Sequence, residues 1–196
     1  VYDEWIVRDQ GAMVRQIGYS PKEFAQIMID KEGGVANAKK LFDKSEVKPS
    51  DYHPEDVRIN SAGEKYSKIL NNVFKEGYDF SDYNRASSIY WPGNRLGHGR
   101  EDVARFWNSL KNIFTEIKFS IEHVGYLDEP IKNPRASIRW FLEGIHSNDS
   151  DDYGKKTNSK LFIMGINHVE LNKDGIIREW VLFDEVAIWK QILMNK

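Results

Sequence analysis

Residues 179–192 read EWVLFDEVAIWKQI, an apolar strand that ends at an acid, Asp184, and continues into a short tail. Residues 4–17 read EWIVRDQGAMVRQI, and six residue types coincide when the two stretches are compared at a constant offset of 175 positions. A repeat at that spacing has the size of a domain and not of a solenoid unit. We therefore expect residues 1–50 to be the terminal strand and helical linker left from a preceding similar domain, and residues 51–196 to form one whole domain.

Helix signals dominate the first half of the chain. A serine followed three residues later by a glutamate forms a capping box at Ser20 and again at Ser61. Proline at position 21 suits the first helical position, and Gly77 suits the end of the later helix. The expected helices cover 21–32, 35–44, 61–76 and 100–114. The stretch 48–54 holds two prolines and is expected to be the linker.

Beyond residue 114 the spacing of the apolar residues changes from helical to alternating. The strands that we expect cover 1–9, 117–127, 135–145, 159–171 and 176–184. Residues 172–175 read Asn-Lys-Asp-Gly, which suits a type I turn followed by a glycine bulge between the last two strands. Helices first and an antiparallel meander afterwards predict an α+β domain with its helices on one face of a curved antiparallel sheet.

Composition narrows the class of function. The net charge is −2, so no basic face for nucleic acid is indicated. The chain has no cysteine, which excludes disulfides and thiolate chemistry and permits a reducing compartment. The longest apolar run, Leu161 to Ile166, is too short to cross a bilayer, and acids interrupt the start of the chain where a signal peptide would lie. We expect a cytoplasmic protein that binds neither nucleic acid nor a membrane.

A series of short motifs resembles the SnoaL-like polyketide cyclase branch of the nuclear transport factor 2-like superfamily, over about residues 61–194. The motifs are Tyr90-Trp91-Pro92-Gly93, Gly97-His98-Gly99-Arg100, Phe106-Trp107, Arg139-Trp140, Gly144-Ile145-His146, Asp174-Gly175-Ile176-Ile177 and the tail from Asp184 to Gln191-Ile192. The resemblance implies a cone-shaped, cystatin-like α+β domain: a bent antiparallel sheet wrapped around helices, with a pocket inside the cone. Relatives include cyclases, isomerases, dehydratases, binding modules and oligomerisation domains, so the fold leaves the function open.

Asp184 is the first candidate for catalysis. In the cyclases that the chain resembles, an acid near the end of the last strand acts as general acid/base. A carboxylate in an apolar pocket has a raised pKa and can carry protons near neutral pH. The alternative is that Asp184 caps the tail, because aspartate is a preferred N-cap. Its copy at Asp9 fits either interpretation.

His168 is the expected catalytic partner of Asp184. If Asn172 pairs with Ile176 across the turn, His168 lies opposite Trp180 and on the face of Asp184; a two-residue turn would direct it to the other face. Trp180 and Asp184 are separated by roughly 13 Å of strand, so a bound substrate would have to span the gap. The alternative is a core histidine with its hydrogen bonds satisfied.

Aromatic and histidine side chains supply the expected ligand-binding residues. The residues expected to line a pocket are Trp180, Trp91, Tyr90, Trp140, His146 and His98. Small-molecule pockets are mostly apolar with a few convergent polar groups. The alternative places the aromatic residues in the core or an oligomer interface and the two histidines in loops or helix caps. No His/Cys spacing indicates a metal site, and we expect neither a metal nor a redox cofactor.

Two functions follow from this reasoning. The first is an acid/base enzyme of cyclase, isomerase or hydratase type, which acts on a small hydrophobic carbonyl compound without a cofactor. The second is a non-catalytic ligand-binding or dimerisation domain. In that case the expected partner is a second copy in a homodimer, or the similar domain of the same chain.

Overall fold

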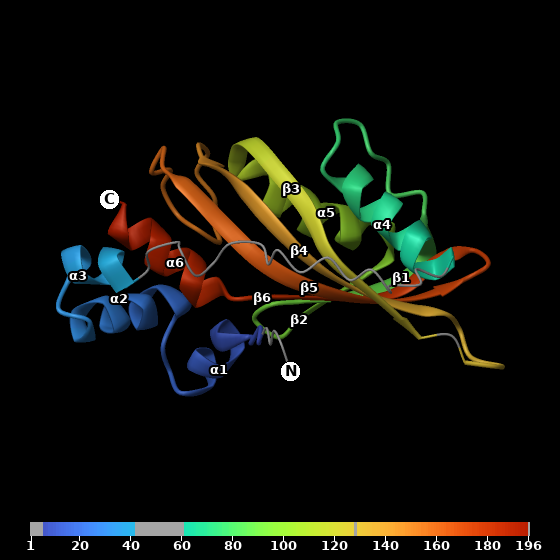
Figure 1. Cartoon of the computed structure of the whole chain (residues 1–196), viewed down its shortest axis with the longest axis horizontal. Coiled ribbons are helices and arrows are strands. Elements are labelled where there is room, and N and C mark those ends of the chain that lie inside the picture. Colours follow the sequence, from blue (N-terminus) through green and yellow to red (C-terminus); the bar gives the residue numbers. More distant parts are fainter. Residues whose placement is uncertain (1–5, 42–60, 128, 196) are drawn as a thin grey trace.

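An antiparallel meander of four long strands occupies the second half of the chain (Figure 1). These strands are β3 (Phe114–Leu127), β4 (Arg135–His146), β5 (Lys160–Asn172) and β6 (Gly175–Phe183). The computed structural model describes residues 6–41, 61–127 and 129–195. Alternate residues of β4 are buried because they face the core, while their neighbours face outward. The four strands expected here are confirmed to within a few residues.

Two strands that the sequence analysis missed complete the sheet. They are β1 (Tyr83–Trp91) and β2 (Arg95–His98), which form an antiparallel hairpin. Strand β1 also pairs in parallel with β6, so the order across the sheet is β2-β1-β6-β5-β4-β3. An irregularity between Tyr83 and Ser88 interrupts the pairing with β6. That irregularity breaks the alternation of apolar residues, which is why the pattern of β1 is not visible in the sequence.

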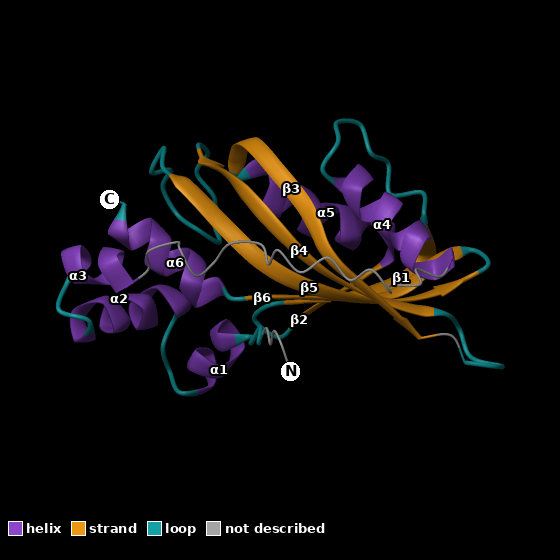
Figure 2. Ribbon diagram, in the orientation of Figure 1, coloured by secondary structure: helices purple, strands orange, loops and turns teal. Residues whose placement is uncertain are grey.

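Two amphipathic helices cover one face of the sheet (Figure 2). They are α4 (Ser61–Val73) and α5 (Gly99–Asn112), and their buried residues join the inward residues of the strands in one core. The largest fully buried side chains are Trp107, Trp140, Tyr66 and Tyr83. The domain is therefore an α+β fold with helices on one face of a curved sheet, as expected. Helix α4 ends at Val73 and not near Glu76, because a turn from Asn72 to Lys75 follows it.

The N-terminal helices pack on the C-terminal helix and not on the sheet. They are α1 (Gln10–Gln16), α2 (Pro21–Lys31) and α3 (Val35–Leu41), and the C-terminal helix is α6 (Glu185–Met194). Ser20 caps α2 in the expected capping box. Among the described residues, no helix is long and apolar enough to span a membrane.

The prediction of a strand over residues 1–9 is wrong for residues 6–9, the part of that range that the structure describes. Residues 6–9 pair with no described strand; they lead directly into α1, whose first amides are capped by Asp9. Residues 1–5 of that expectation, the linker 48–54 and the end of the helix 35–44 lie outside the described residues. The repeat is nevertheless visible locally, because Asp9 and Asp184 occupy the same position before α1 and α6.

Candidate functional site

A buried carboxylate, Glu179, lies at the centre of the cone. Its Oε1 accepts hydrogen bonds from the Tyr66 hydroxyl at 2.5 Å and from Asn167 Nδ2 at 2.9 Å. Its Oε2 accepts from the Tyr83 hydroxyl at 2.9 Å and from Trp107 Nε1 at 3.2 Å. These four donors come from α4, β5, β1 and α5. Glu179 on β6 therefore joins the helices to three strands of the sheet.

The electrostatics of Glu179 follow from its complete burial. Burial raises the pKa of the Glu179 carboxyl because the charged form loses its hydration, and the hydrogen bonds from Tyr66 and Tyr83 act in the opposite direction. Burial and the neighbouring carboxylate raise the pKa of both tyrosines, so their hydroxyls remain donors. Because Glu179 has no exposed surface, we assign it a structural role.

Sequence reasoning missed Glu179 although one signal was present. Along β6, Glu179 shares a face with Val181 and Phe183, both of which are buried. An acid on the core-facing side of an alternating strand requires partners, because a buried charge without them is costly. The sequence analysis instead placed the neighbouring Trp180 near a ligand.

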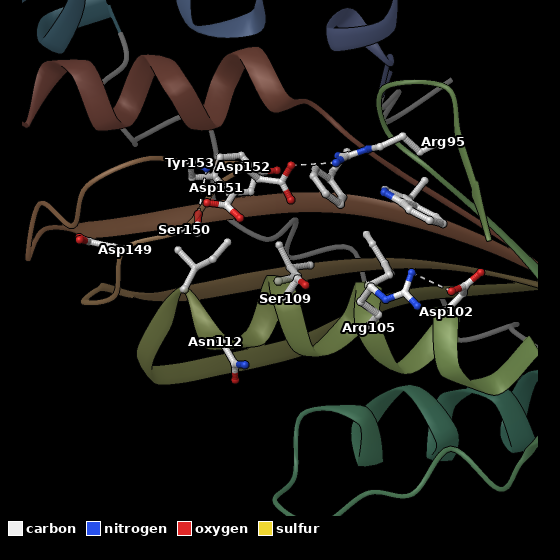
Figure 3. Close-up of a pocket in the computed structure, with 15 residues that line it drawn as sticks. Arg95, Asp102, Arg105, Ser109, Asn112, Asp149, Ser150, Asp151, Asp152 and Tyr153 are labelled. Atoms are coloured by element: carbon white, nitrogen blue, oxygen red, sulfur yellow. Dashed lines mark hydrogen bonds and ion pairs between the residues drawn. The ribbon is translucent and has the colours of Figure 1, made fainter. Parts of the chain in front are cut away.

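A cavity of about 360 Å³ opens beside this network, between α5, the β1–β2 hairpin and residues 149–153 (Figure 3). Its apolar wall consists of Trp91, Phe106, Leu110, Ile113 and Phe183. The Phe106 ring lies 5.3 Å from the Trp91 ring and 4.9 Å from the Trp107 ring, measured between centroids. Phe106 therefore separates the cavity from the indole that donates to Glu179.

Charged side chains form the rim of the cavity, and most of them are paired. Arg95 Nη1 lies 2.8 Å from Asp152 Oδ1, and Arg105 Nη1 lies 2.9 Å from Asp102 Oδ1. Figure 3 shows both pairs at opposite sides of the opening. Burial raises the pKa of the Tyr153 hydroxyl, so this group remains protonated at neutral pH. Paired charges with an apolar wall behind them suit an uncharged or weakly polar ligand.

Trp91 is the one predicted ligand-binding residue that lines this cavity. Trp140 is fully buried, and its Nε1 donates to Asn167 Oδ1 at 2.7 Å. The structure thus places Trp140 in the core, where its indole supports the Asn167 amide that donates to Glu179.

Asp184 lies outside the cone, at a second cavity of about 320 Å³ between residues 6–8, β5 and α6. Its Oδ1 accepts hydrogen bonds from the backbone N–H groups of Val186 at 2.8 Å and Ala187 at 3.2 Å. Asp184 is therefore the N-cap of α6, as the alternative interpretation proposed. Burial raises the pKa of this carboxyl, and the two backbone hydrogen bonds oppose the rise. Its role in catalysis remains a prediction.

His168, Trp180 and Tyr90 lie together on the outer face of the sheet. His168 pairs with Trp180, as expected, although the turn has two residues and an irregularity between Glu170 and Leu171 restores the register. The Trp180 and Tyr90 rings stack at 5.6 Å, with 39% and 36% of these residues exposed. The structure does not place any of the three in the described cavities.

His146 and His98 occupy the ends of regular elements. His146 is buried, its Nδ1 lies 3.3 Å from Thr157 Oγ1, and burial lowers its pKa. The His98 ring lies 3.2 Å from Ser88 Oγ at the start of α5. Neither histidine lines a described cavity, and among the described residues no cluster of His, Asp and Glu could hold a metal ion.

No protein-family model matches the chain, and no curated protein matches it. Solved structures do match. A candidate SnoaL-like polyketide cyclase from Shewanella putrefaciens CN-32 superposes with a TM-score of 0.56 over 74% of this chain and 97% of its own, at 16% identity. The chain has a SnoaL-like fold. IdmH, a candidate polyketide cyclase from Streptomyces antibioticus, gives 0.55 over 68% and 99% at 13% identity.

The SnoaL-like fold confirms the resemblance inferred from the motifs. AclR, a candidate hydroxylase from Streptomyces galilaeus, has the same fold, with a TM-score of 0.52 over 67% of this chain and 97% of its own at 10% identity. Structures with different described activities thus share this SnoaL-like framework, which at these identities establishes the fold alone.

Proposed function

We propose that the chain is a small-molecule pocket protein and that its ligand binds in the cavity beside Phe106. The observation that carries this proposal is a preformed cavity of about 360 Å³ with an aromatic wall and a polar rim. That volume lies within the range of about 300–1,000 Å³ usual for ligand pockets. The solved structures with the same fold support the proposal, because they are described as candidate polyketide cyclases and a candidate hydroxylase.

The lining of the cavity favours a small hydrophobic carbonyl compound. The Phe106 ring lies 5.3 Å from the Trp91 ring and 6.5 Å from the Phe183 ring, measured between centroids, so a flat ring system would pack against this aromatic wall. Arg95 has five N–H donors, of which three are directed at Pro92 O, Asp152 and Glu185. The remaining donors suit a carbonyl oxygen at the rim.

Ser109→Trp tests this site. Ser109 is exposed on α5 and lines the cavity, so the indole would fill the cavity without displacing the core. We expect the affinity for N-phenyl-1-naphthylamine, an uncharged aromatic dye that fluoresces when bound, to fall about tenfold or more. Ser109→Ala is the matched control and should bind as the wild type does. Equal affinity of Ser109→Trp and wild type would show that the probe does not bind in this cavity.

Acid/base catalysis by Asp184 is the second candidate function. It is favoured by one observation: burial raises the Asp184 pKa beside a cavity whose lining includes Ile6, Phe162 and Met164. Both backbone hydrogen bonds use Oδ1, and the described residues donate none to Oδ2. This oxygen is therefore the one that would take a proton from a carbon next to a carbonyl group.

Asp184→Asn separates the two roles of this residue. Asparagine caps helices as well as aspartate does, so the free energy of unfolding should change by less than about 1 kcal/mol. Loss of general-base catalysis should lower turnover by about 100-fold or more. Native mass spectrometry of the purified protein identifies a co-purified compound, and its single-turnover conversion is then compared in the two proteins. Equal conversion would leave Asp184 as a helix cap.

A further inference from the structure

Asp9, the N-cap of α1, contacts the turn between β1 and β2. The cavity residues Trp91 and Arg95 lie on either side of this turn. Asp9 Oδ1 accepts from the Ala12 N–H at 2.8 Å and caps α1, while Asp9 Oδ2 accepts from the Gly93 N–H at 2.9 Å. Gly93 lies between Trp91 and Arg95, the cavity residues of the β1–β2 hairpin, and has a φ of 88°. One carboxylate thus fixes both the start of α1 and the hairpin turn.

A chain of ion pairs makes a second connection between α1 and the cavity. Arg15 Nη1 lies 2.6 Å from Glu185 Oε2, and Arg95 Nη2 lies 3.0 Å from Glu185 Oε1. The Glu185 side chain is only 4% exposed, so both guanidinium groups compensate a buried charge. Arg95 continues the chain to Asp152, on the same side of the cavity, at 2.8 Å. Arg15 and Arg95 therefore share one buried carboxylate, Glu185.

Gly11 allows the close approach that these contacts need. A Cβ atom at position 11 would lie 2.0 Å from Glu185 Oε2 and 2.9 Å from Arg15 Nη1. Any larger residue would therefore displace the carboxylate or move α1 away from α6. Gly11 lies in the first turn of α1, and the contact with Glu185 explains the absence of a side chain there.

We propose that Asp9 and Arg15 are positioning residues for the cavity, which hold Trp91 and Arg95 in their ligand-binding places from the N-terminal segment. This inference rests on the proposed function of the cavity. It means that α1 is part of the binding site although none of its residues lines the cavity. It also means that ligand binding and the docking of α1 stabilise each other, because coupling between two sites is reciprocal.

Asp9→Asn tests the hydrogen bond to the hairpin without removing the cap. The asparagine Oδ1 can still accept from Ala12, whereas its Nδ2 cannot accept from the Gly93 N–H. We expect the affinity for N-phenyl-1-naphthylamine to fall about tenfold, as for the loss of one charge-assisted hydrogen bond. Hydrogen exchange at the Gly93 amide should become faster.

Gly11→Ala tests the ion-pair route independently. Alanine favours the helical state of α1 but collides with Glu185, so weaker binding could not be attributed to loss of the helix. Glu32→Gln is the matched control. It removes the 2.6 Å ion pair between Glu32 and Lys190, which also joins the N-terminal segment to α6. Neither residue lines the cavity. We expect Gly11→Ala to weaken probe binding severalfold and Glu32→Gln to bind as the wild type does.

The reciprocal measurement is hydrogen exchange of α1 with and without the probe. If the proposal holds, saturation with the probe slows exchange of the α1 amides in the wild type and not in Asp9→Asn. Wild-type affinity in both Asp9→Asn and Gly11→Ala, with binding still abolished by Ser109→Trp, would overturn this inference and leave the cavity intact. Binding that Ser109→Trp does not weaken would overturn the proposed function instead.

Discussion

Replacing Glu179 with alanine lowers the free energy of unfolding by about 3–5 kcal/mol, because four buried donors lose their acceptor. The hydroxyls of Tyr66 and Tyr83, the Trp107 indole and the Asn167 amide all donate to this carboxylate. The two hydroxyls and the indole are left without an acceptor and carry their desolvation cost, whereas Asn167 Nδ2 still donates to the Tyr66 hydroxyl at 2.7 Å. Urea titration with an unchanged slope measures the difference.

Glu143→Ala is the matched control for this prediction. Glu143 lies on β4 in an ion pair with Lys160, and its side chain is 26% exposed. Exposed ion pairs contribute at most about 1 kcal/mol, so the control should lose no more than that. A loss at Glu179 as small as the loss at Glu143 would show that the network in the cone does not hold α4 and α5 on the sheet.

Because the pKa of Glu179 is raised, its contribution to the free energy of unfolding should decrease as the pH rises, which is the opposite of the usual behaviour of a carboxyl group. A carboxyl whose folded pKa lies above its unfolded value contributes stability that is present below the unfolded pKa and is lost as the pH rises through the folded pKa. Relative to Glu179→Gln, the wild type should therefore gain stability as the pH falls toward about 4.5, the ordinary glutamate value. Parallel stability profiles of the two proteins across this range would contradict the assignment.

Gly165→Ala lowers the free energy of unfolding by about 3 kcal/mol, since the Trp140 ring lies directly over this glycine. A Cβ atom at position 165 would lie 2.1 Å from Trp140 Cζ2 and 2.3 Å from Cε2. The indole cannot shift easily, because its Nε1 donates to Asn167 and its ring packs against Trp107 and Phe183. Thermal and urea unfolding measure the loss.

Gly125→Ala provides the comparison on the same sheet. A Cβ atom there would meet nothing closer than Ser137 Cβ at 3.9 Å. Alanine should be neutral or slightly stabilising at this position, because it restricts the unfolded chain. If Gly165→Ala were as stable as Gly125→Ala, the result would contradict the close packing of the Trp140 ring on Gly165.

Most of the fold could be predicted because its signals are local. Alternation marked β3 to β6, the capping box marked α2, and the order of short motifs indicated the SnoaL-like fold. Strand β1 was missed because an irregularity in its pairing removes the alternation. The expected strand before Asp9 was wrong because residues 6–9 have no described strand to pair with.

The candidate site was harder to predict because its contacts connect distant parts of the chain. Trp91 was correctly expected to line a cavity, but its neighbours come from α5 and from residues 149–153. Asp184 and His168 do not share a site, because Asp184 follows the last strand as the N-cap of α6 and His168 faces outward beside Trp180. Sequence spacing gives the face of each strand; it does not show which loop or helix covers that face.

Comparison of residues 9–12 with residues 184–187 separates the residues that start a helix from those whose tertiary contacts differ. Asp9 and Asp184 both receive an amide hydrogen bond from the alanine three positions later, Ala12 and Ala187, so these two shared residue types start a helix in both places. The two segments differ at Gly11 and Val186. The backbone at Gly11 lies against the Glu185 carboxylate, whereas the Val186 side chain lies in an apolar cluster. Two segments of similar sequence thus share one local conformation at the start of a helix while their tertiary contacts differ.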